Sequence, residues 1–316
     1  MKKRIKKYDK NKITDLWQKR ASEYSEETKK IIENAYVTEP TALYHYTSID
    51  VLKNIMKTKE LWYTHYQDLD DGDELTLPYN ECKAAIEDVA NQSKKEYFWK
   101  PIREIFCQDD FLKRLSVYTL SFSTENDSSE LWQSFGDNHK GCIIKFKEDF
   151  SQPNAQVSKN DPLVISAPIN YQNEAFINQV RQFAFLAEAH LDAVVNDSIR
   201  LTKDIIREFH SRLICDIISI IPLNIKEKYS TEKELRRFII ELHHNNNYYP
   251  CEIPEDLKSK ENSKRIVRSI FKHEYIDEII VGKNANIVEI QQYINETCGS
   301  HSIKVVPSEK LHTYDM

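Results

Sequence analysis

Residues 42–66 read ALYHYTSIDVLKNIMKTKELWYTHY. The apolar and aromatic residues of ALYHYTS predict a short strand that ends in a turn. Ser48 or Asp50 can cap the helix that follows, and the apolar residues of that helix recur on one face. LWYTHY predicts a second strand. The stretch is therefore a strand–helix–strand unit, and it indicates a protein that mixes strands with helices.

Further strands and helices are predicted on both sides of this unit. Strands are predicted at SVYTLSFS (116–123), GCIIKFK (141–147), EYIDEIIVG (274–282) and HSIKVVPS (301–308). Helices are predicted at 13–35, within 77–115, and in a short segment that ends near Tyr293. Alternating strands and helices with mostly short connections predict an α+β fold.

Residues 174–220 differ from this alternating pattern. Apolar residues that include Phe176, Phe183, Leu191 and Phe209 recur there at spacings of three and four residues, or multiples of them. The pattern predicts one long amphipathic helix or two helices in a hairpin, which pack into the core or join a homo-oligomer. We expect residues 1–40 to form a basic arm and a helix. Residues 41–316 would then form a single α+β domain with a helical insertion at about 174–220.

Length and composition restrict the class of protein. The chain has 316 residues, of which 40% are hydrophobic and 30% are charged, as in an ordinary globular protein. No apolar run approaches the ~20 residues that span a bilayer, and the basic N-terminus is not followed by the apolar stretch of a secretory signal. The six cysteines are scattered without a CxxC pair, which argues against a structural zinc site and a disulfide framework. We therefore expect a cytoplasmic protein with reduced thiols and no metal.

The charge is distributed unevenly along the chain. The net charge is -6, yet the first twelve residues carry seven Lys or Arg and only one Asp. Such a basic arm is either a solvated tail or a means of gripping phosphates. Only five glycines occur, and neither GxGxxG nor GxxxxGK[ST] can be assembled from them. The two common backbone cradles for a diphosphate are therefore absent.

Three clusters of residues are candidates for a catalytic or ligand-binding site. His45 stands near the end of a predicted strand, just before a helix N-terminus whose free N–H groups suit a phosphate or a sugar hydroxyl; the alternative is a structural histidine. In SFSTENDSSELWQSFGD (121–137), Trp132 and Phe135 lie beside several serines and could sandwich a flat ring, or they could simply fill the core. The serines of this segment are Ser121, Ser123, Ser128 and Ser129.

The third cluster is the charged segment STEKELRRF (230–238). Glu232, Glu234 and Arg236 alternate, so a strand would place all three on one face, and a helix would scatter them over a solvated surface. We predict a strand.

Five of these segments, in this order, resemble the bacterial family called domain of unknown function 2971. They are LYHYTSIDVLKNIMKTKELWYT, DLDDGDE, SFSTENDSSELWQSFGDNHKGCIIKF, STEKELRRF and EYIDEIIVG, and the resemblance runs from about residue 43 to 308. The chain departs from the family at Leu69–Gly72, where members usually show Phe-Asn-Asp-Pro, and at Leu235, where they carry an aromatic residue.

A more distant similarity links the chain to ADP-ribosyltransferases. LYHYTS followed by a helix resembles their opening strand, and SFSTENDSSELWQSF resembles the second block of the diphtheria-toxin and poly(ADP-ribose) polymerase branch. The resemblance implies a split, mixed or antiparallel sheet and NAD as the substrate. It also implies that His45, with Tyr46 and Thr47, binds ribose. Ser128 or Ser129 would bind the carboxamide beside Ser121 and Ser123, and Trp132 or Phe135 the ring.

In this family a glutamate on a later strand completes the site. Glu234 is the positional match, with Glu232 and Arg236 beside it. The implied activity is cleavage of the nicotinamide–ribose bond of NAD and transfer of ADP-ribose to a protein or nucleic acid, in a bacterial toxin or in phage defence. The alternatives are a non-catalytic module of a defence system that senses a nucleotide or binds a partner, and a nucleic-acid enzyme guided by the basic arm.

Overall fold

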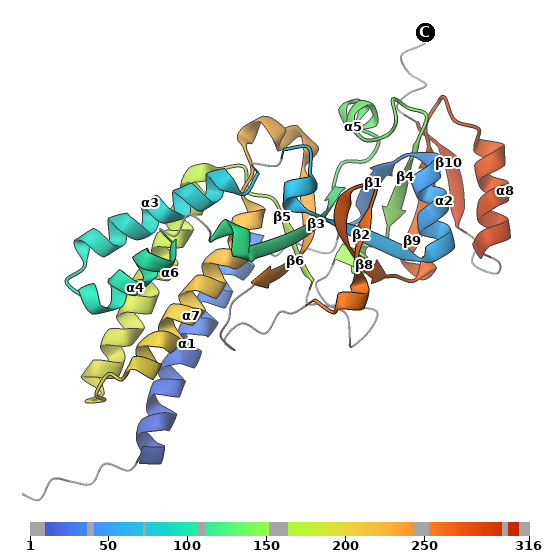
Figure 1. The fold of residues 1–316 in the computed structure, drawn as a ribbon. Helices are drawn as coiled ribbons and strands as arrows, with labels where there is room; N and C mark the ends of the chain where they lie inside the picture. The colour runs from blue at the N-terminus through green and yellow to red at the C-terminus, as the bar shows by residue number, and fades with distance from the viewer. Residues whose placement is uncertain are drawn as a thin grey trace, which may run out of the picture. The chain divides into compact units, whose positions relative to one another are not determined.

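A computed structural model describes residues 10–36, 41–71, 74–106, 111–151, 164–242, 253–298 and 303–309. The chain forms an α+β fold that divides into two units (Figure 1). The helical unit comprises Met1–Val37, Leu75–Lys113 and Gln172–Asn224. The sheet unit comprises Thr38–Glu74, Arg114–Tyr171 and Ile225–Met316. Within the described ranges, no helix is both long and apolar enough to cross a membrane.

The helical unit is built around α6, which packs against α1, α3 and α7. Phe176, Phe183, Leu191 and Phe209 are fully buried, which confirms their predicted inward orientation. Segment 174–220 forms two helices, because the chain breaks after α6 and Thr202 caps α7 by accepting a hydrogen bond from the Ile205 amide. The helices of this unit are α1 (Lys10–Tyr36), α3 (Thr76–Gln92), α4 (Glu96–Phe106), α6 (Asn173–Asn196) and α7 (Lys203–Ile220).

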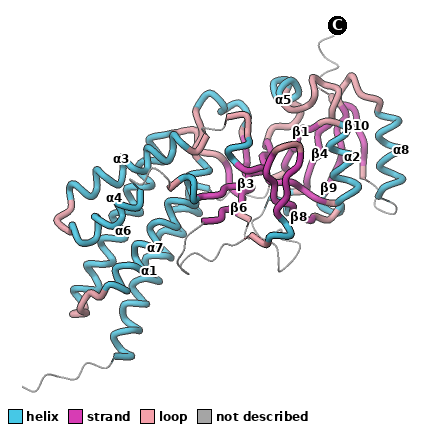
Figure 2. Tube along the Cα trace, viewed as in Figure 1, coloured by secondary structure: helices cyan, strands magenta, loops and turns pink. Residues whose placement is uncertain are grey.

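The sheet unit holds a mixed, mostly antiparallel and open sheet, drawn in magenta in Figure 2. Eight of its ten described strands follow the order β10-β9-β4-β1-β3-β2-β8-β7. The other two lie off this path, where β6 pairs with both β3 and β5. Among the described strand pairs, only β9–β10 is parallel. The strands are β1 (Leu43–Thr47), β2 (Glu60–His65), β3 (Leu115–Ser123), β4 (Cys142–Phe146), β5 (Ile165–Pro168), β6 (Glu234–Leu242), β7 (Lys258–Glu261), β8 (Lys264–Ile270), β9 (Ile276–Val281) and β10 (Lys304–Pro307).

The sheet is split along one edge of β3. On its other edge, β3 pairs with β6 over its whole length. On the split edge, β2 pairs with Tyr118 and Thr119, and β1 pairs only with Ser123. The three residues between these pairs, 120–122, have neither β1 nor β2 as a ladder partner. The two strands therefore diverge and leave an opening in the middle of the sheet.

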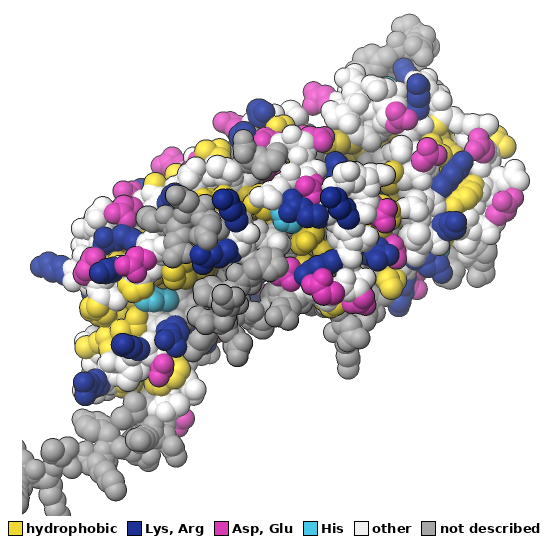
Figure 3. All heavy atoms as spheres, viewed as in Figure 1, with side chains coloured by type: hydrophobic (Ala, Val, Ile, Leu, Met, Phe, Trp, Pro, Cys, Tyr) yellow, Lys and Arg dark blue, Asp and Glu magenta, His cyan; other side chains and the backbone are white. Residues whose placement is uncertain are grey.

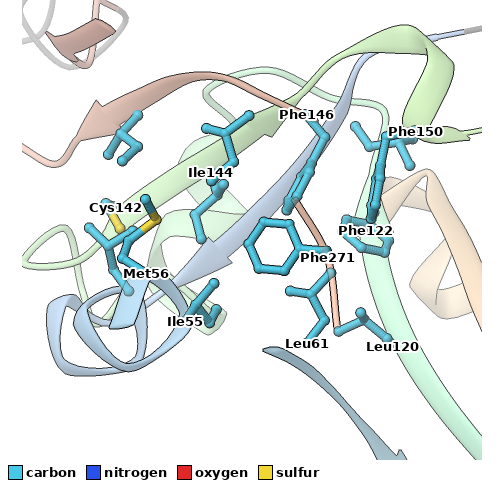
Figure 4. Packing of buried hydrophobic residues seen from close by; sticks show 14 of the residues in the cluster. Ile55, Met56, Leu61, Leu120, Phe122, Cys142, Ile144, Phe146, Phe150 and Phe271 are labelled. Carbon is cyan, nitrogen blue, oxygen red and sulfur yellow. The ribbon is translucent and has the colours of Figure 1, made fainter. Parts of the chain in front are cut away.

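Helices cover both faces of the half-sheet that contains β1, β4 and β9. On one face, α2 (Ile49–Thr58) and α8 (Ile287–Cys298) bury their apolar residues in the main core. In that core, Phe146 stacks on Phe150 with ring centroids 4.4 Å apart and meets Phe122 edge-on (Figure 4). On the other face, Trp132 and Leu131 of α5 (Ser129–Ser134) pack against Tyr46, Ile143 and Ile280. The two layers hold β1 firmly beside the opening.

Candidate functional site

A cavity of about 850 Å³ occupies the opening in the sheet. Strands β1, β2, β3 and β6 line it, together with α2, α5 and the acidic loop that precedes Glu74. All of its lining residues belong to the sheet unit. The residues predicted from the sequence that line it are His45, Tyr46, Ser121, Ser123, Phe135, Glu232, Glu234 and Arg236.

His45 bridges the split in the sheet. Its Nδ1 atom lies 3.2 Å from the carbonyl oxygen of Ser121, on the part of β3 that neither β1 nor β2 pairs. A carbonyl oxygen can only accept a hydrogen bond, so Nδ1 carries the proton and Nε2 is left as an acceptor. Burial lowers the pKa of His45 and outweighs the opposing effect of the Ser121 carbonyl, which keeps the ring neutral. His45 therefore offers a neutral acceptor nitrogen.

Glu234 is held by a buried ion-pair network. Arg236 donates from Nε to Oε1 of Glu234 at 2.8 Å and from Nη2 to Oε2 at 3.2 Å. It also bonds to both carboxylate oxygens of Glu74. Burial opposes the charge on Arg236, but Glu234 and Glu74 raise its pKa above the ordinary value. Both residues of β6 are buried, and their alternation on the strand directs them to one face, as predicted.

Glu232 reaches the same cavity by a different route from the one predicted. The expected strand begins only at Glu234, and Glu232 is the last residue of a 3-10 turn (Glu227–Glu232). Lys233 separates them with a left-handed backbone at φ 41°, so strand alternation cannot place Glu232. Instead, the Ser123 hydroxyl donates to the Glu232 carbonyl oxygen at 2.7 Å. This bond fastens the turn to the end of β3.

The carboxylates of Glu232 and Glu234 differ in their bonding, because Arg236 donates hydrogen bonds to Glu234 and not to Glu232. Within the described ranges, no hydrogen bond or ion pair reaches the carboxylate oxygens of Glu232. Burial, followed by the charges of Glu234 and Glu74, raises the pKa of Glu232 to about 7 against the partial opposition of Arg236. Two carboxylates in one cavity thus differ in chemistry, because one is fixed by a cation and the other can exchange a proton near neutral pH.

The two aromatic candidates of α5 have opposite orientations. Trp132 is fully buried, and its indole N–H donates to Asp127 at 2.6 Å, so it does not line the cavity. The structure thus places Trp132, one of the two predicted ring contacts, in the core beneath α5 and outside the cavity lining. Phe135 caps the end of α5, is 50% exposed and lines the cavity. Phe135 is the aromatic residue of this segment that a ligand can touch.

Three other predicted ligand contacts lie outside the cavity lining. Thr47 is buried at the end of β1, Ser128 caps α5 by accepting from the Leu131 amide, and Ser129 is exposed on the first turn. Ser128 also donates its backbone N–H to the Tyr46 hydroxyl at 2.8 Å, which shows that it supports the α5 loop. The structure therefore does not bring Thr47, Ser128 and Ser129 together with the other predicted residues in this cavity. Among the serines of the segment, Ser121, Ser123 and Ser134 line the cavity.

Several lining residues escaped the sequence-based prediction. Glu74 comes from the acidic loop. Its partner Arg236 is 162 positions away, so no local sequence pattern predicts that the two side chains pair. Trp62 lies on β2 between buried neighbours, and this alternation shows only that it points away from the core. The sequence does not tell whether its side chain faces a cavity or solvent. Tyr229 donates to Asp71, which Lys226 also contacts at 3.1 Å. These contacts close the acidic side of the cavity.

The cavity lining is strongly acidic. Among the lining residues that the structure describes, seven are carboxylates and only one, Arg236, is a cation. Nevertheless, the described residues contain no group of three or more His, Cys, Asp or Glu side chains in a metal-holding arrangement. Such a lining favours a ligand or a transition state that bears positive charge.

Comparison with protein-family models, with curated proteins and with solved structures gives no match to this chain. The resemblances drawn from the sequence motifs stay predictions, and the cavity itself carries the functional inference.

Proposed function

We propose that the protein cleaves the nicotinamide–ribose bond of NAD and transfers the ADP-ribose to a macromolecular acceptor. The observation that carries this proposal is that His45, Glu232 and Glu234 line one cavity at the split of the sheet. The proposed fold is accordingly of the split-sheet, ADP-ribosyltransferase-like type.

The strand order supports the proposal. The three motifs that resemble ADP-ribosyltransferases lie far apart in sequence, yet their strands β1, β3 and β6 are neighbours in the sheet. His45 contacts β3 at Ser121, and Glu234 is paired with Ser123 at the end of the same strand. A histidine, two serines and a glutamate thus reach the cavity from three adjacent strands.

The charge of the site suits the chemistry. Cleavage of this bond proceeds through a sugar with cation-like character, as in glycoside hydrolysis. Glu234 stabilises that charge, and Arg236 keeps its carboxylate oriented without leaving the cavity neutral, because Glu74 and Glu232 add further carboxylates. As the bond breaks, its electron pair passes to the ring nitrogen of the pyridinium. Nicotinamide therefore leaves neutral and needs no proton.

The remaining steps concern hydrogen bonds and one proton. His45 accepts a hydrogen bond from a ribose hydroxyl through Nε2 and so fixes the sugar. The acceptor attacks the anomeric carbon of the ribose, and its proton passes to the free carboxylate of Glu232, whose pKa of about 7 suits a base at neutral pH. Phe135 provides a flat apolar surface for the leaving ring.

One observation favours a second function. Both carboxylate oxygens of Glu234 accept hydrogen bonds from Arg236, so this carboxylate is already paired before a ligand binds. Under this second function the protein is a sensor module, and NAD or a related nucleotide stays intact in the cavity.

Nicotinamide release and NAD binding separate these functions. A transferase should bind NAD in calorimetry and release nicotinamide, and adenine-labelled ADP-ribose should become acid-precipitable when an acceptor is present. A sensor should bind NAD and return it unchanged. Failure of wild-type protein to bind NAD at millimolar concentration would overturn the transferase and leave a sensor of another nucleotide standing.

A further inference from the structure

The proposed function leaves one physical difficulty, which concerns the phosphates of NAD. The diphosphate is negatively charged, whereas the cavity lining holds seven carboxylates. Arg236, the single cation among the described lining residues, is already bonded to Glu234 and Glu74. An unpaired diphosphate next to these carboxylates would be repelled. The anionic part of the ligand must therefore leave the acidic part of the cavity.

Strand β2 offers a way out toward β8. Trp62 lines the cavity and is directly opposite Arg268 in the antiparallel β2–β8 ladder. Directly opposite residues project from the same face, with Cβ atoms about 4.5–5.5 Å apart. Arg268 thus stands next to a residue of the cavity wall, on the cavity side of the sheet.

Arg268 has the free charge that the cavity lacks. Its Nη2 atom donates to the carbonyl oxygen of Asp256 at 3.4 Å, and within the described ranges no carboxylate forms an ion pair with it. The side chain is half-buried, so it can reach both the ladder and solvent. By contrast, Arg265 on the opposite face is bound to Asp68 through three hydrogen bonds.

The neighbours of Arg268 on the same face of the sheet add apolar and basic side chains beside it. Ile270 is 54% exposed, which is unusual for a strand residue of its size, and Lys264 is exposed at the other end of β8. Residues 264, 266, 268 and 270 alternate toward the cavity side of the sheet. Figure 3 shows Lys and Arg side chains, in dark blue, beside Asp and Glu side chains, in magenta, over the region where Figure 1 labels β8.

We propose that Trp62, Arg268 and Ile270 form a binding site for the phosphate-bearing, nucleoside end of the ligand. Arg268 binds the diphosphate through charge-assisted hydrogen bonds, and Trp62 and Ile270 supply a flat apolar surface for a nucleobase. Lys264 adds longer-range attraction, which its exposed contact with Asp70 only weakly offsets. Glu60, which accepts from the Trp62 indole at 3.2 Å, directs the phosphates toward Arg268 by repelling them. This assignment rests on the proposed function for the identity of the ligand.

The assignment orients the ligand across the split. The cationic nicotinamide ribose faces the carboxylates of β6, and the anionic diphosphate lies over β2 and β8. Each end of the ligand thus meets side chains of the opposite charge. Specificity for a dinucleotide over a nucleoside would come from Arg268 on β8.

Calorimetry with four ligands tests the assignment on the full-length protein. Arg268→Gln should weaken binding of NAD, ADP-ribose and ADP about tenfold. It should leave nicotinamide riboside, which has no phosphate, unaffected, and Arg268→Lys should recover part of the loss. The matched control is Lys260→Gln, which removes a cation of the same hairpin from the opposite face and should change no affinity.

Each other outcome overturns a distinct claim. Equal binding of ADP by wild type and Arg268→Gln, or an equal loss in Lys260→Gln, would overturn the phosphate site. Arg268-dependent binding of ADP together with failure to bind NAD would leave the phosphate site standing and overturn the proposed function. No binding of any phosphate-bearing probe by wild type would overturn both.

Discussion

Arg236 holds Glu234 through two nitrogen atoms, with Nε 2.8 Å from Oε1 and Nη2 3.2 Å from Oε2. The same guanidinium bonds to Glu74, so one buried cation organises two carboxylates. The network fixes the orientation of the Glu234 and Glu74 carboxylates. Because Arg236 is buried with them, the same hydrogen bonds also contribute to the stability of the sheet unit.

Replacing Arg236 should therefore destabilise the protein. Arg236→Met leaves Glu234 and Glu74 buried without their cation, and the free energy of unfolding should fall by about 3–5 kcal/mol. Lys272→Met removes an exposed pair with Glu274 and should cost less than about 1 kcal/mol. Urea denaturation of both variants measures the difference. Equal losses would show that the Arg236 network is not a buried ion pair in solution.

Glu232 should make stability depend on pH. Its pKa in the folded protein is about 7, above the ordinary value of 4.5, so its favourable contribution is complete below about pH 4.5. That contribution is lost as the pH rises through about 7, because the folded protein then buries an unpaired charge. Glu232→Gln cannot ionise, so its melting temperature relative to wild type should rise between about pH 5 and pH 8.

A matched control for this effect lies in the same turn. Glu227 is exposed, and Glu227→Gln should track the wild type at every pH. A melting-temperature difference for Glu232→Gln that does not change with pH would contradict the raised pKa.

The aromatic residues of α5 should separate binding from stability. Phe135→Ala should weaken NAD binding about 2- to 10-fold and leave the melting temperature nearly unchanged, because the ring is half exposed. Trp132→Ala should lower the free energy of unfolding by about 3–5 kcal/mol, since it empties a fully buried site. Calorimetry and urea denaturation on both variants check this. Loss of stability in Phe135→Ala with intact binding would reverse the assignment.

His45 should act through Nε2 alone. His45→Asn retains a side-chain N–H that can donate to the Ser121 carbonyl, but it removes the acceptor nitrogen Nε2. The variant should fold normally and bind NAD about tenfold more weakly. Near wild-type affinity would show that His45 serves only to bridge the split.

Much of the sheet unit could be predicted from local pattern. The β-branched and aromatic residues of ALYHYTS (42–48), 116–123 and 274–282 predict strands, and the structure has β1, β3 and β9 there. The β7–β8 hairpin was missed, because its charged sequence resembles a solvated loop. Its turn is formed by Asn262 and Ser263, both with positive φ, and no glycine marks it.

The site was predicted only as far as sequence spacing allows. Alternation predicts that Glu234 and Arg236 lie on one face of a strand, as they do in β6. It does not predict the position of Glu232, because Lys233 between Glu232 and the strand has a left-handed backbone. A spacing of three placed Trp132 and Phe135 on one side of a turn. Which ring enters the core depends on Asp127, whose carboxylate receives the Trp132 N–H through tertiary contact. Pairings such as Arg236 with Glu74 and Trp62 with Arg268 become visible only in the folded sheet.

The most direct measurement is the rate of nicotinamide release from saturating NAD by Glu234→Gln and wild type. The variant keeps the shape of the side chain and removes the charge that stabilises the cation-like ribose. Turnover should fall on the order of 10²-fold or more, while the NAD dissociation constant measured by calorimetry should change little. Release of nicotinamide by Glu234→Gln at the wild-type rate would contradict the proposed role of Glu234 and the catalytic site built around it.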